Sequence, residues 1–337
     1  MVCTPESFGP EIAPLTDNLY VRRWSPSVPL DDSFAHMFAS AFRRDTFYYF
    51  LPRLCHQPEL EHIIEEAGLT NASGPAQVAQ RDSLIARVNK NWTYAKNLWA
   101  LKHLVACYDP KVVTWLAYQK NDTKKTPQVN DDCVGFAQWF LPDSLAVRES
   151  WCNYLTRKYL EFKLSFLGYW YFGFKEQPIF NNRFHRYHNI SHQAEGVAFA
   201  HNDDDEYLHE LSMKSTEELT GAGLPEIEKV AYPVRDIGYL SWFCVSKKAH
   251  GTGIGTKFLS YTIDNIPNQL TEIVSPVDST SKSYGPQKLC LHATQLGEPF
   301  YKKLGFETLV AYNLGNRYTP LKRNALMVKT RDKPLSV

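Results

Sequence analysis

The sequence predicts an α/β protein in which helices pack against a central sheet. Strand and helix patterns alternate over the last hundred residues, which is typical of this class. Two earlier strand patterns, at 111–119 and 133–140, enclose a polar segment and predict an antiparallel hairpin with a long tip. An apolar strand pattern at 237–245 runs through a glycine-rich turn into an amphipathic helical pattern.

The first third of the chain predicts one strand followed mostly by helices. Residues 19–24 alternate in polarity, as a strand does. Asp31 or Asp32 suits the N-cap of a helix that continues to Phe42 with apolar residues at helical spacing. The segment 54–105 is mostly helical in propensity.

A long aromatic helix is predicted over about 142–175. We expect its aromatic stripe to pack on the sheet, because such stripes usually belong to a core; a wall of a substrate pocket is the alternative. Beyond it, an acidic turn at 201–206 precedes a helix that begins near Tyr207. The stripe consists of Trp151, Tyr154, Tyr159, Phe162, Phe166 and Trp170.

The C-terminal hundred residues supply the strand–helix alternation. After the strand at 237–245, the pattern predicts a helix over 253–266 and then a mobile loop rich in Ser, Pro and Thr over 267–286. The other predicted elements are a strand at 288–294, a short helix at 298–304, and strands at 306–313 and 324–330.

The composition predicts a globular protein without a specialised partner. Hydrophobic residues make up 44% and charged residues 22% of 337 residues, and the net charge is +1, so we expect no nucleic-acid partner. The seven cysteines are scattered without a CxxC pair, which favours free thiols in a reducing compartment. No signal peptide and no long apolar run are visible, so we expect a cytoplasmic protein with no membrane partner.

The turn after the strand at 237–245 is a candidate phosphate site. Its glycines let a ligand approach the backbone and permit positive φ, and successive N–H groups at a helix start attract a diphosphate. The dinucleotide fingerprint needs glycine where Thr256 or Phe258 stands, and Thr256 also interrupts the P-loop pattern before Lys257. A tight turn that binds no ligand is the alternative.

Two segments near the C-terminus carry motif-like patterns: residues 245–259 read VSKKAHGTGIGTKFL, and residues 291–306 read LHATQLGEPFYKKLGF. They resemble motifs A and B of the GCN5-related N-acetyltransferases, the GNAT superfamily. In that family the loop amides of motif A hold the CoA pyrophosphate, and motif B is a strand followed by a helix. Pro299 suits the first turn of that helix, Gly305 suits the left-handed residue past its end, and Phe306 is expected to pack back on the helix.

The resemblance implies a single GNAT-like domain over 1–337 with the α+β GNAT fold, a mixed sheet of about six to seven strands and large helical insertions. Its N-terminal half is expected at 15–140, and its acetyl-CoA-binding half, with both motifs, at 236–330. A helical insertion at 142–235 is the expected acceptor side. The chain resembles long, fungal-type members with such insertions.

The resemblance also implies acetyl-CoA as co-substrate and no metal. His250 stands where the family has Arg or Gln, so we expect CoA binding to depend on backbone N–H groups; an exposed histidine without a ligand role is the alternative. Backbone amides of Phe243, Cys244 and Val245 are expected to polarise the thioester carbonyl. For Cys244, a nucleophile and a buried thiol are the alternatives. The loop comprises His250, Gly251, Thr252, Gly253, Ile254, Gly255 and Thr256.

In this family an amine attacks the thioester directly, so a base must remove its proton. The resemblance places the base or a water-holding group on the strand before motif A, which makes Ser241 a candidate. His292 on the next strand is the candidate base, since histidine changes charge near neutral pH; a structural histidine is the alternative, and Asp236 is a second candidate. Period-two spacing puts four residues on one strand face: Tyr239, Ser241, Phe243 and Val245.

Tyr301 corresponds to the family tyrosine that lies near the CoA sulfur, where it binds the co-substrate and protonates the departing thiolate. A tyrosine hydroxyl is protonated at neutral pH and therefore able to donate. A helix tyrosine that only packs on the core is the alternative. The histidines at 185, 188 and 192 have no Cys or Glu beside them, so we predict no metal site.

The predicted function is an acetyl-CoA-dependent N-acetyltransferase that acts on a small-molecule amine by direct attack. A protein lysine acetyltransferase or an O-acetyltransferase is a second enzyme hypothesis. A non-catalytic sensor that binds acyl-CoA with a GNAT-like fold is the alternative outside enzymes.

Overall fold

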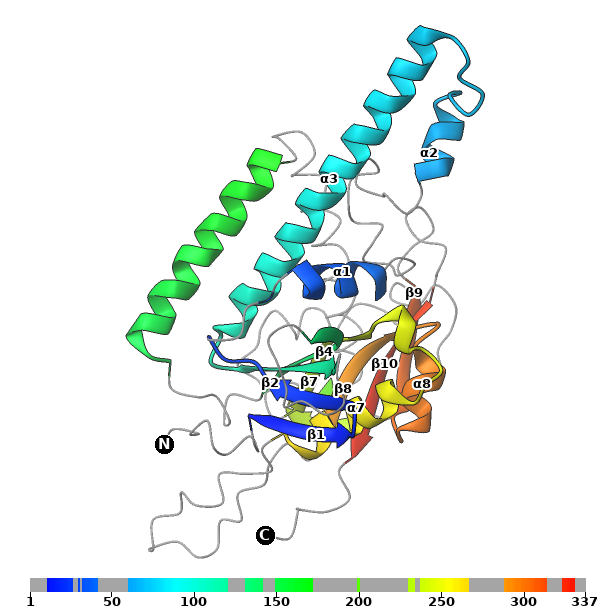
Figure 1. The fold of residues 1–337 in the computed structure, drawn as a ribbon. Coiled ribbons are helices and arrows are strands. Elements are labelled where there is room, and N and C mark those ends of the chain that lie inside the picture. Colours follow the sequence, from blue (N-terminus) through cyan, green and yellow to red (C-terminus); the bar gives the residue numbers. More distant parts are fainter. Residues whose placement is uncertain are drawn as a thin grey trace, which may run out of the picture.

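The computed structural model describes residues 11–26, 30, 32–41, 60–120, 131–141, 149–171, 199–200, 230–233, 237–266, 288–313 and 323–330 (Figure 1). Within them, the main sheet has eight strands in the order β1-β2-β3-β4-β7-β8-β10-β9. Two short strands, β5 (Phe199–Ala200) and β6 (Val230–Pro233), form a separate parallel pair.

Among the first five strands of the main sheet, each strand is antiparallel to the next. The predicted hairpin is confirmed, because β3 pairs with β4; residues 121–130 of its tip lie outside the described residues. β1 was not predicted from the sequence, because Pro14 interrupts its pattern; an edge strand tolerates proline. The five are β1 (Ile12–Thr16), β2 (Leu19–Arg23), β3 (Val112–Gln119), β4 (Asp132–Phe140) and β7 (Ile237–Val245).

The second half of the sheet contains β8 (Lys288–Thr294), β10 (Arg323–Thr330) and β9 (Glu307–Asn313), again antiparallel. The two halves meet in one parallel pair, β7 with β8, which has four residue pairs and ends at Leu240↔Leu291. The sheet is therefore mixed and flanked by helices, which confirms the predicted α+β fold class. Its eight strands exceed the predicted six to seven, and β1 is the addition.

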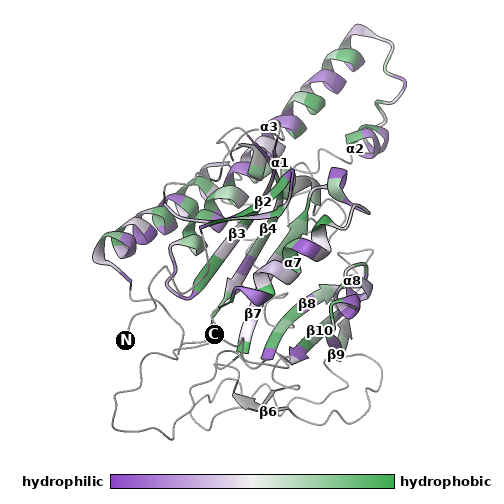
Figure 2. Ribbon diagram, turned by 60° about the horizontal axis from the view of Figure 1, so that its bottom comes forward, coloured by the Kyte–Doolittle hydropathy of each residue, from purple (hydrophilic) through white to green (hydrophobic). Residues whose placement is uncertain are grey.

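Helices cover both faces of the main sheet (Figures 1 and 2). On one face lie α1 and α3, which share a buried cluster with β4 and β7. On the other lie α7 and α8, which pack on a larger cluster from β2 through β10. The helices of the described chain are α1 (Asp32–Ala41), α2 (Leu60–Glu66), α3 (Pro75–Cys107), an unlabelled helix at 151–171, α7 (Ile254–Asp264) and α8 (Glu298–Lys303).

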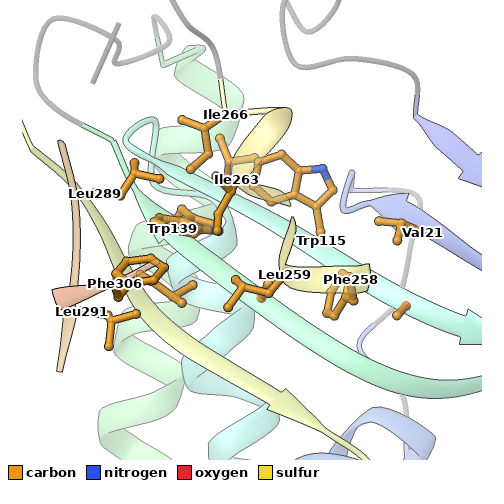
Figure 3. Close-up of a cluster of buried hydrophobic side chains, with 14 of the residues drawn as sticks. Val21, Trp115, Trp139, Phe258, Leu259, Ile263, Ile266, Leu289, Leu291 and Phe306 are labelled. Atoms are coloured by element: carbon orange, nitrogen blue, oxygen red, sulfur yellow. The ribbon is translucent and has the colours of Figure 1, made fainter. Parts of the chain in front are cut away.

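The α7 face holds the main core (Figure 3). Trp115 and Trp139 are fully buried between the sheet and α7, and the indole N–H of Trp139 donates to the Thr262 hydroxyl at 3.2 Å. Phe258 of α7 packs so closely on Gly135 that a Cβ there would lie 3.0 Å from two ring atoms. Each such aromatic stabilises the fold by roughly 1.5–3 kcal/mol, and together they fix α7 against β4 and β7.

The aromatic helix exists at 151–171, but the expectation that its stripe packs on the sheet is wrong. The helix lies beside α3, where Tyr171 stacks on Tyr94 with ring centroids 4.0 Å apart (green in Figure 1). The stripe faces solvent; Trp170, for example, is 73% exposed. Helical periodicity showed that the helix has an apolar face without showing what that face meets.

Of the helices in the described part of the chain, none is long and apolar enough to cross a membrane. Five cysteines lie in that part and all are free thiols; Cys3 and Cys55 lie outside it. The predicted acidic turn, the helix near Tyr207 and the predicted loop at 267–286 also fall outside the described residues.

Candidate functional site

The sheet opens where β7 and β8 stop pairing. Pairing ends at Leu240 and Leu291, and the next residues are Ser241 and His292. We call this point the fork. Two of the predicted catalytic residues therefore stand at the fork, one on each strand. Beyond it, the side of β7 that faces away from β4 is not hydrogen-bonded to β8.

A β-bulge at Ser241 changes which side chains share a face of β7. Neighbouring residues Gln138 and Trp139 of β4 pair with Trp242 and Leu240, so Ser241 is the extra residue. Tyr239 consequently meets Phe140 and His292, whereas Phe243 packs with Phe258 and Phe300 on the α7 face. The predicted common face of Tyr239, Ser241, Phe243 and Val245 is therefore wrong, because period-two spacing assumes a regular strand.

Beyond the bulge the strand is regular, and its backbone groups alternate between β4 and the open side. The amide of Ser246 donates to Val134 of β4 at 2.7 Å. By alternation Cys244 also bonds to β4, and the amides of Phe243 and Val245 point to the open side. Of the three amides predicted to polarise a carbonyl, Phe243 and Val245 are thus in position to meet a ligand beyond the fork.

The Cys244 thiol lies on the other face of β7. It donates to the Met37 sulfur at 3.6 Å, and burial raises the pKa of the thiol well above its usual value. A nucleophile requires the thiolate, which this environment disfavours. The structure therefore favours the buried structural thiol over the nucleophile.

The glycine loop connects β7 to α7 through a short 3₁₀ turn, η7 (Lys247–Ala249). Gly251 and Gly253 have φ of +77° and +80°, and a Cβ on either would meet no atom within 4 Å. The Thr252 hydroxyl donates to the Ala249 carbonyl at 2.7 Å and closes the turn. The loop therefore needs glycine for its conformation and leaves open space above two of its residues.

The first turn of α7 presents backbone donors. Gly253 is the N-cap, no side chain caps the helix, and the first helical hydrogen bond runs from Lys257 N to Gly253 O. The amides of Ile254, Gly255 and Thr256 therefore have no acceptor within the helix. Such a group of donors, at the positive end of the helix dipole, favours an anionic oxygen.

The His250 side chain is hydrogen-bonded to the backbone of β7. Its Nε2 lies 3.1 Å from the Val245 carbonyl and donates to it, so the ring braces the loop against β7. Positive charge comes instead from the exposed lysines at 247, 248 and 257, and no acidic residue occurs between 237 and 263. The surroundings of the loop thus favour an anion without the His250 side chain. These lysines were visible in the sequence as a charge pattern, but the sequence interpretation did not use them.

α8 holds Tyr301 by a glycine-terminated cap. Gly305 has φ of +80°, its amide donates to Lys302 O, and the amide of Phe306 donates to Tyr301 O. These two bonds form the Schellman motif, so the left-handed role predicted for Gly305 is confirmed. Phe306 packs back on the Tyr301 ring at 6.0 Å between centroids, also as predicted.

An aromatic cluster joins the loop, the open side of β7 and Tyr301. The Phe243 ring stacks on Phe300 with centroids 5.6 Å apart and meets the edge of Tyr301 at 6.4 Å. A Cβ on Gly255 would lie 3.6 Å from Phe300, so the start of α7 touches α8. Neither Phe258 nor Phe300 was predicted as a site residue, because their role depends on contact between separate elements.

His292 and Tyr301 lie on opposite faces of the sheet. Tyr301 packs with the α7-face cluster, to which Leu291 and Ala293 of β8 also belong. Because side chains alternate along a strand, His292 points to the opposite face, where its ring meets Tyr239 at 5.8 Å. Strand pairing between β7 and β8 has ended at this level of the sheet.

A buried polar network lies on the α1 and α3 face near Trp242. His103 Nδ1 contacts Gln138 Oε1 at 3.3 Å, and Gln138 donates to Thr114 at 3.2 Å. Burial, with Lys102 as a neighbour, lowers the pKa of His103 to about 3. Burial likewise lowers the pKa of Lys102, which stands over the Trp242 ring, to about 8. His103 is therefore a neutral imidazole that joins α3 to β4.

Among the described residues, no three His, Cys, Asp or Glu side chains stand close enough together to hold a metal ion. The histidines at 185, 188 and 192 and the second base candidate, Asp236, fall outside the described residues.

No protein-family model and no curated protein sequence matches the chain. Solved structures do match. One is described as histone acetyltransferase HPA2 and related acetyltransferase from Corynebacterium glutamicum. The two sequences are 13% identical, the match covers 95% of this chain and 99% of that chain, and the TM-score is 0.37. Another is PH1933 from Pyrococcus horikoshii, with 12% sequence identity, coverage of 94% of this chain and 99% of that chain, and a TM-score of 0.31.

A third match is Arabidopsis thaliana Naa50 in complex with the bisubstrate analogue CoA-Ac-MVNAL. The two sequences are 20% identical, the match covers 28% of this chain and 55% of that chain, and the TM-score is 0.22. At these identities the likeness concerns the fold alone.

Proposed function

We propose that the chain is an acyltransferase that uses acetyl-CoA and transfers the acetyl group to an amine of a small molecule. The observation that carries this proposal is the convergence of three features at the fork. These are the uncapped amides of α7, the open side of β7 and the hydroxyl-bearing Tyr301 on α8. Acetyl-CoA has a group that suits each feature. Its diphosphate suits the α7 amides, its extended amide-containing arm suits the open side of β7, and its thioester sulfur suits the Tyr301 hydroxyl.

The order of these features suggests a pose for acyl-CoA. The diphosphate accepts hydrogen bonds from Ile254, Gly255 and Thr256, near the exposed lysines of the loop. The pantetheine arm follows the open side of β7, where its amides replace a missing strand partner. The thioester then reaches the fork, and an amide of Phe243 or Val245 stabilises charge on its carbonyl oxygen.

The chemistry needs no covalent enzyme intermediate. The amine nitrogen attacks the carbonyl carbon, the C–S bond breaks, and Tyr301 gives its proton to the departing thiolate. The proton that the amine loses passes to His292, directly or through a water held by Ser241, and solvent returns a proton to Tyr301. The acceptor approaches from the His292 face, since the CoA arm occupies the Tyr301 face.

Turnover of acetyl-CoA with a panel of amines tests the proposal. The panel includes polyamines, aromatic amines, amino acids and a lysine peptide, with alcohols to detect O-transfer, and a thiol reagent measures CoA release. Release that depends on a small amine supports the proposal, and release with the lysine peptide alone would assign a protein substrate. Tight CoA binding without release across the panel would instead favour an acyl-CoA sensor.

A further inference from the structure

The helix at 151–171 exposes a continuous apolar face that the fork does not use. Seven large apolar side chains on it are between 41% and 73% exposed. At roughly 100° per residue they fall within one sector of roughly 100°, so they form a single stripe along the helix. We call it the aromatic face; it consists of Trp151, Leu155, Tyr159, Phe162, Phe166, Tyr169 and Trp170.

Contacts at both ends of the helix determine which side faces solvent. Near its start, Arg157 binds both carboxylate oxygens of Glu149 at 2.9 Å and lies 3.8 Å from Asp109, just past α3. At its end, Tyr171 stacks on Tyr94 of α3. Rolling the aromatic face inward would break the two contacts that join the helix to the α3 side, those with Asp109 and Tyr94. Contiguous exposed apolar surface of this kind marks an interaction site.

Positive charge borders the aromatic face. Lys158 and Lys163 lie on its two edges by helical spacing, and both are exposed; Lys158 also pairs with Glu161 at 2.7 Å. The helix at 151–171 itself contains three basic residues and one acidic residue, a net charge of +2.

We propose that the aromatic face docks on the surface of a phospholipid membrane with anionic headgroups. Trp and Tyr place an apolar ring below the headgroups and a polar tip among them, and lysines on both edges reach the phosphates. A helix of this length, roughly 31 Å, lies in the plane of the interface with its apolar side inserted. The proposal departs from the expectation of no membrane partner, which used net charge and the lack of a spanning segment.

A second copy of the chain fits the face less well. Two aromatic faces packed on each other would bring the edge lysines of both helices side by side, and like charges oppose that approach. The negative headgroups of anionic lipids, by contrast, attract these positively charged lysines.

Sedimentation of the full chain with phosphatidylcholine vesicles, with and without phosphatidylserine, tests the proposal. We expect binding to the anionic vesicles, a blue shift of tryptophan emission, and release at high salt. Phe162→Ser should weaken binding tenfold or more, since its apolar area no longer enters the bilayer. Lys163→Ala should weaken it about fivefold, which corresponds to about 1 kcal/mol for one lysine at a charged surface.

Leu296→Ser is the matched control, because Leu296 is 68% exposed and Phe162 is 69% exposed, but Leu296 lies just before α8. It should bind vesicles like the unmodified chain, and melting temperatures should agree among all variants. Equal binding by Phe162→Ser, equal binding to neutral vesicles, or no binding at low salt would overturn the proposal. So would a dimer in lipid-free light scattering that Phe162→Ser dissociates, which would assign the face to a second copy.

Discussion

Replacing Gly253 by alanine separates ligand binding from folding at the glycine loop. A Cβ at this position meets no atom within 4 Å, so the folding cost is that of the left-handed conformation alone. For an L-residue this cost is about 1–2 kcal/mol. With an unfolding entropy near 2.1 cal/mol/K per residue, the melting temperature of the chain should fall by about 1–3 °C.

The effect on CoA should be larger than the effect on stability. The methyl group would stand in the open space above the loop, from which a diphosphate approaches the amides of α7. One lost hydrogen bond to a charged oxygen costs about 1.5–3 kcal/mol, so CoA affinity should fall roughly ten- to hundredfold. Calorimetric titration with CoA measures this loss, and thermal unfolding measures the cost in stability.

Gly68→Ala provides the matched control. Gly68 follows α2, has φ of +68° and likewise has open space at its Cβ position. The two variants should lose similar stability, and only Gly253→Ala should lose CoA affinity. If both variants bound CoA equally well, the loop would be a turn without a ligand, and the proposed pose of the diphosphate would be refuted.

Three further changes probe the site and the core. Tyr301→Phe should lower turnover by roughly 10²-fold or more with little change in acetyl-CoA affinity, since only the acid is lost; steady-state kinetics with equal kcat would remove Tyr301 from the mechanism. Gly135→Ala should cost about 1–3 kcal/mol in urea unfolding, because the new methyl group meets the Phe258 ring at 3.0 Å; unchanged stability would mean that the ring yields. Burial lowers the pKa of His103 in the folded chain to about 3, whereas in the unfolded chain it is about 6.5. Between these two pH values only the unfolded chain binds a proton at His103. The free energy of unfolding should therefore fall with decreasing pH, by up to about 1.4 kcal/mol per pH unit. His103→Gln should show a shallower decline in urea unfolding at pH 7.5 and 5, and an identical decline would contradict this assignment.

Local patterns predicted the elements around the fork well. The strand at 237–245 matches β7, and the cap at Gly305 forms as predicted, because a left-handed glycine and an apolar strand depend only on neighbouring residues. The alternation of strands and helices near the C-terminus likewise gave the fold class. These features need no knowledge of distant contacts.

Features that depend on partners were missed. The bulge at Ser241 arises from the register of β7 on β4, which no periodicity in β7 reports. The exposure of the aromatic face depends on the side by which the helix at 151–171 meets α3. Likewise, the sequence marked His250 as a departure from the family, but its bond to the Val245 carbonyl depends on the path of the loop.

Within the described chain, four residue pairs between β7 and β8 are the whole of the strand pairing that connects the five strands from β1 to β7 with the other three, β8, β10 and β9. This short pairing forms a narrow joint between the two parts of the main sheet. Few backbone hydrogen bonds cross this joint, so the packing of α7 and α8 on the shared core carries most of its resistance to bending. A ligand bound along the open side of β7 and in contact with β8 at the fork would stiffen the joint, so its binding should be measurable as slower amide exchange in β9, the strand furthest from the fork in that part of the sheet.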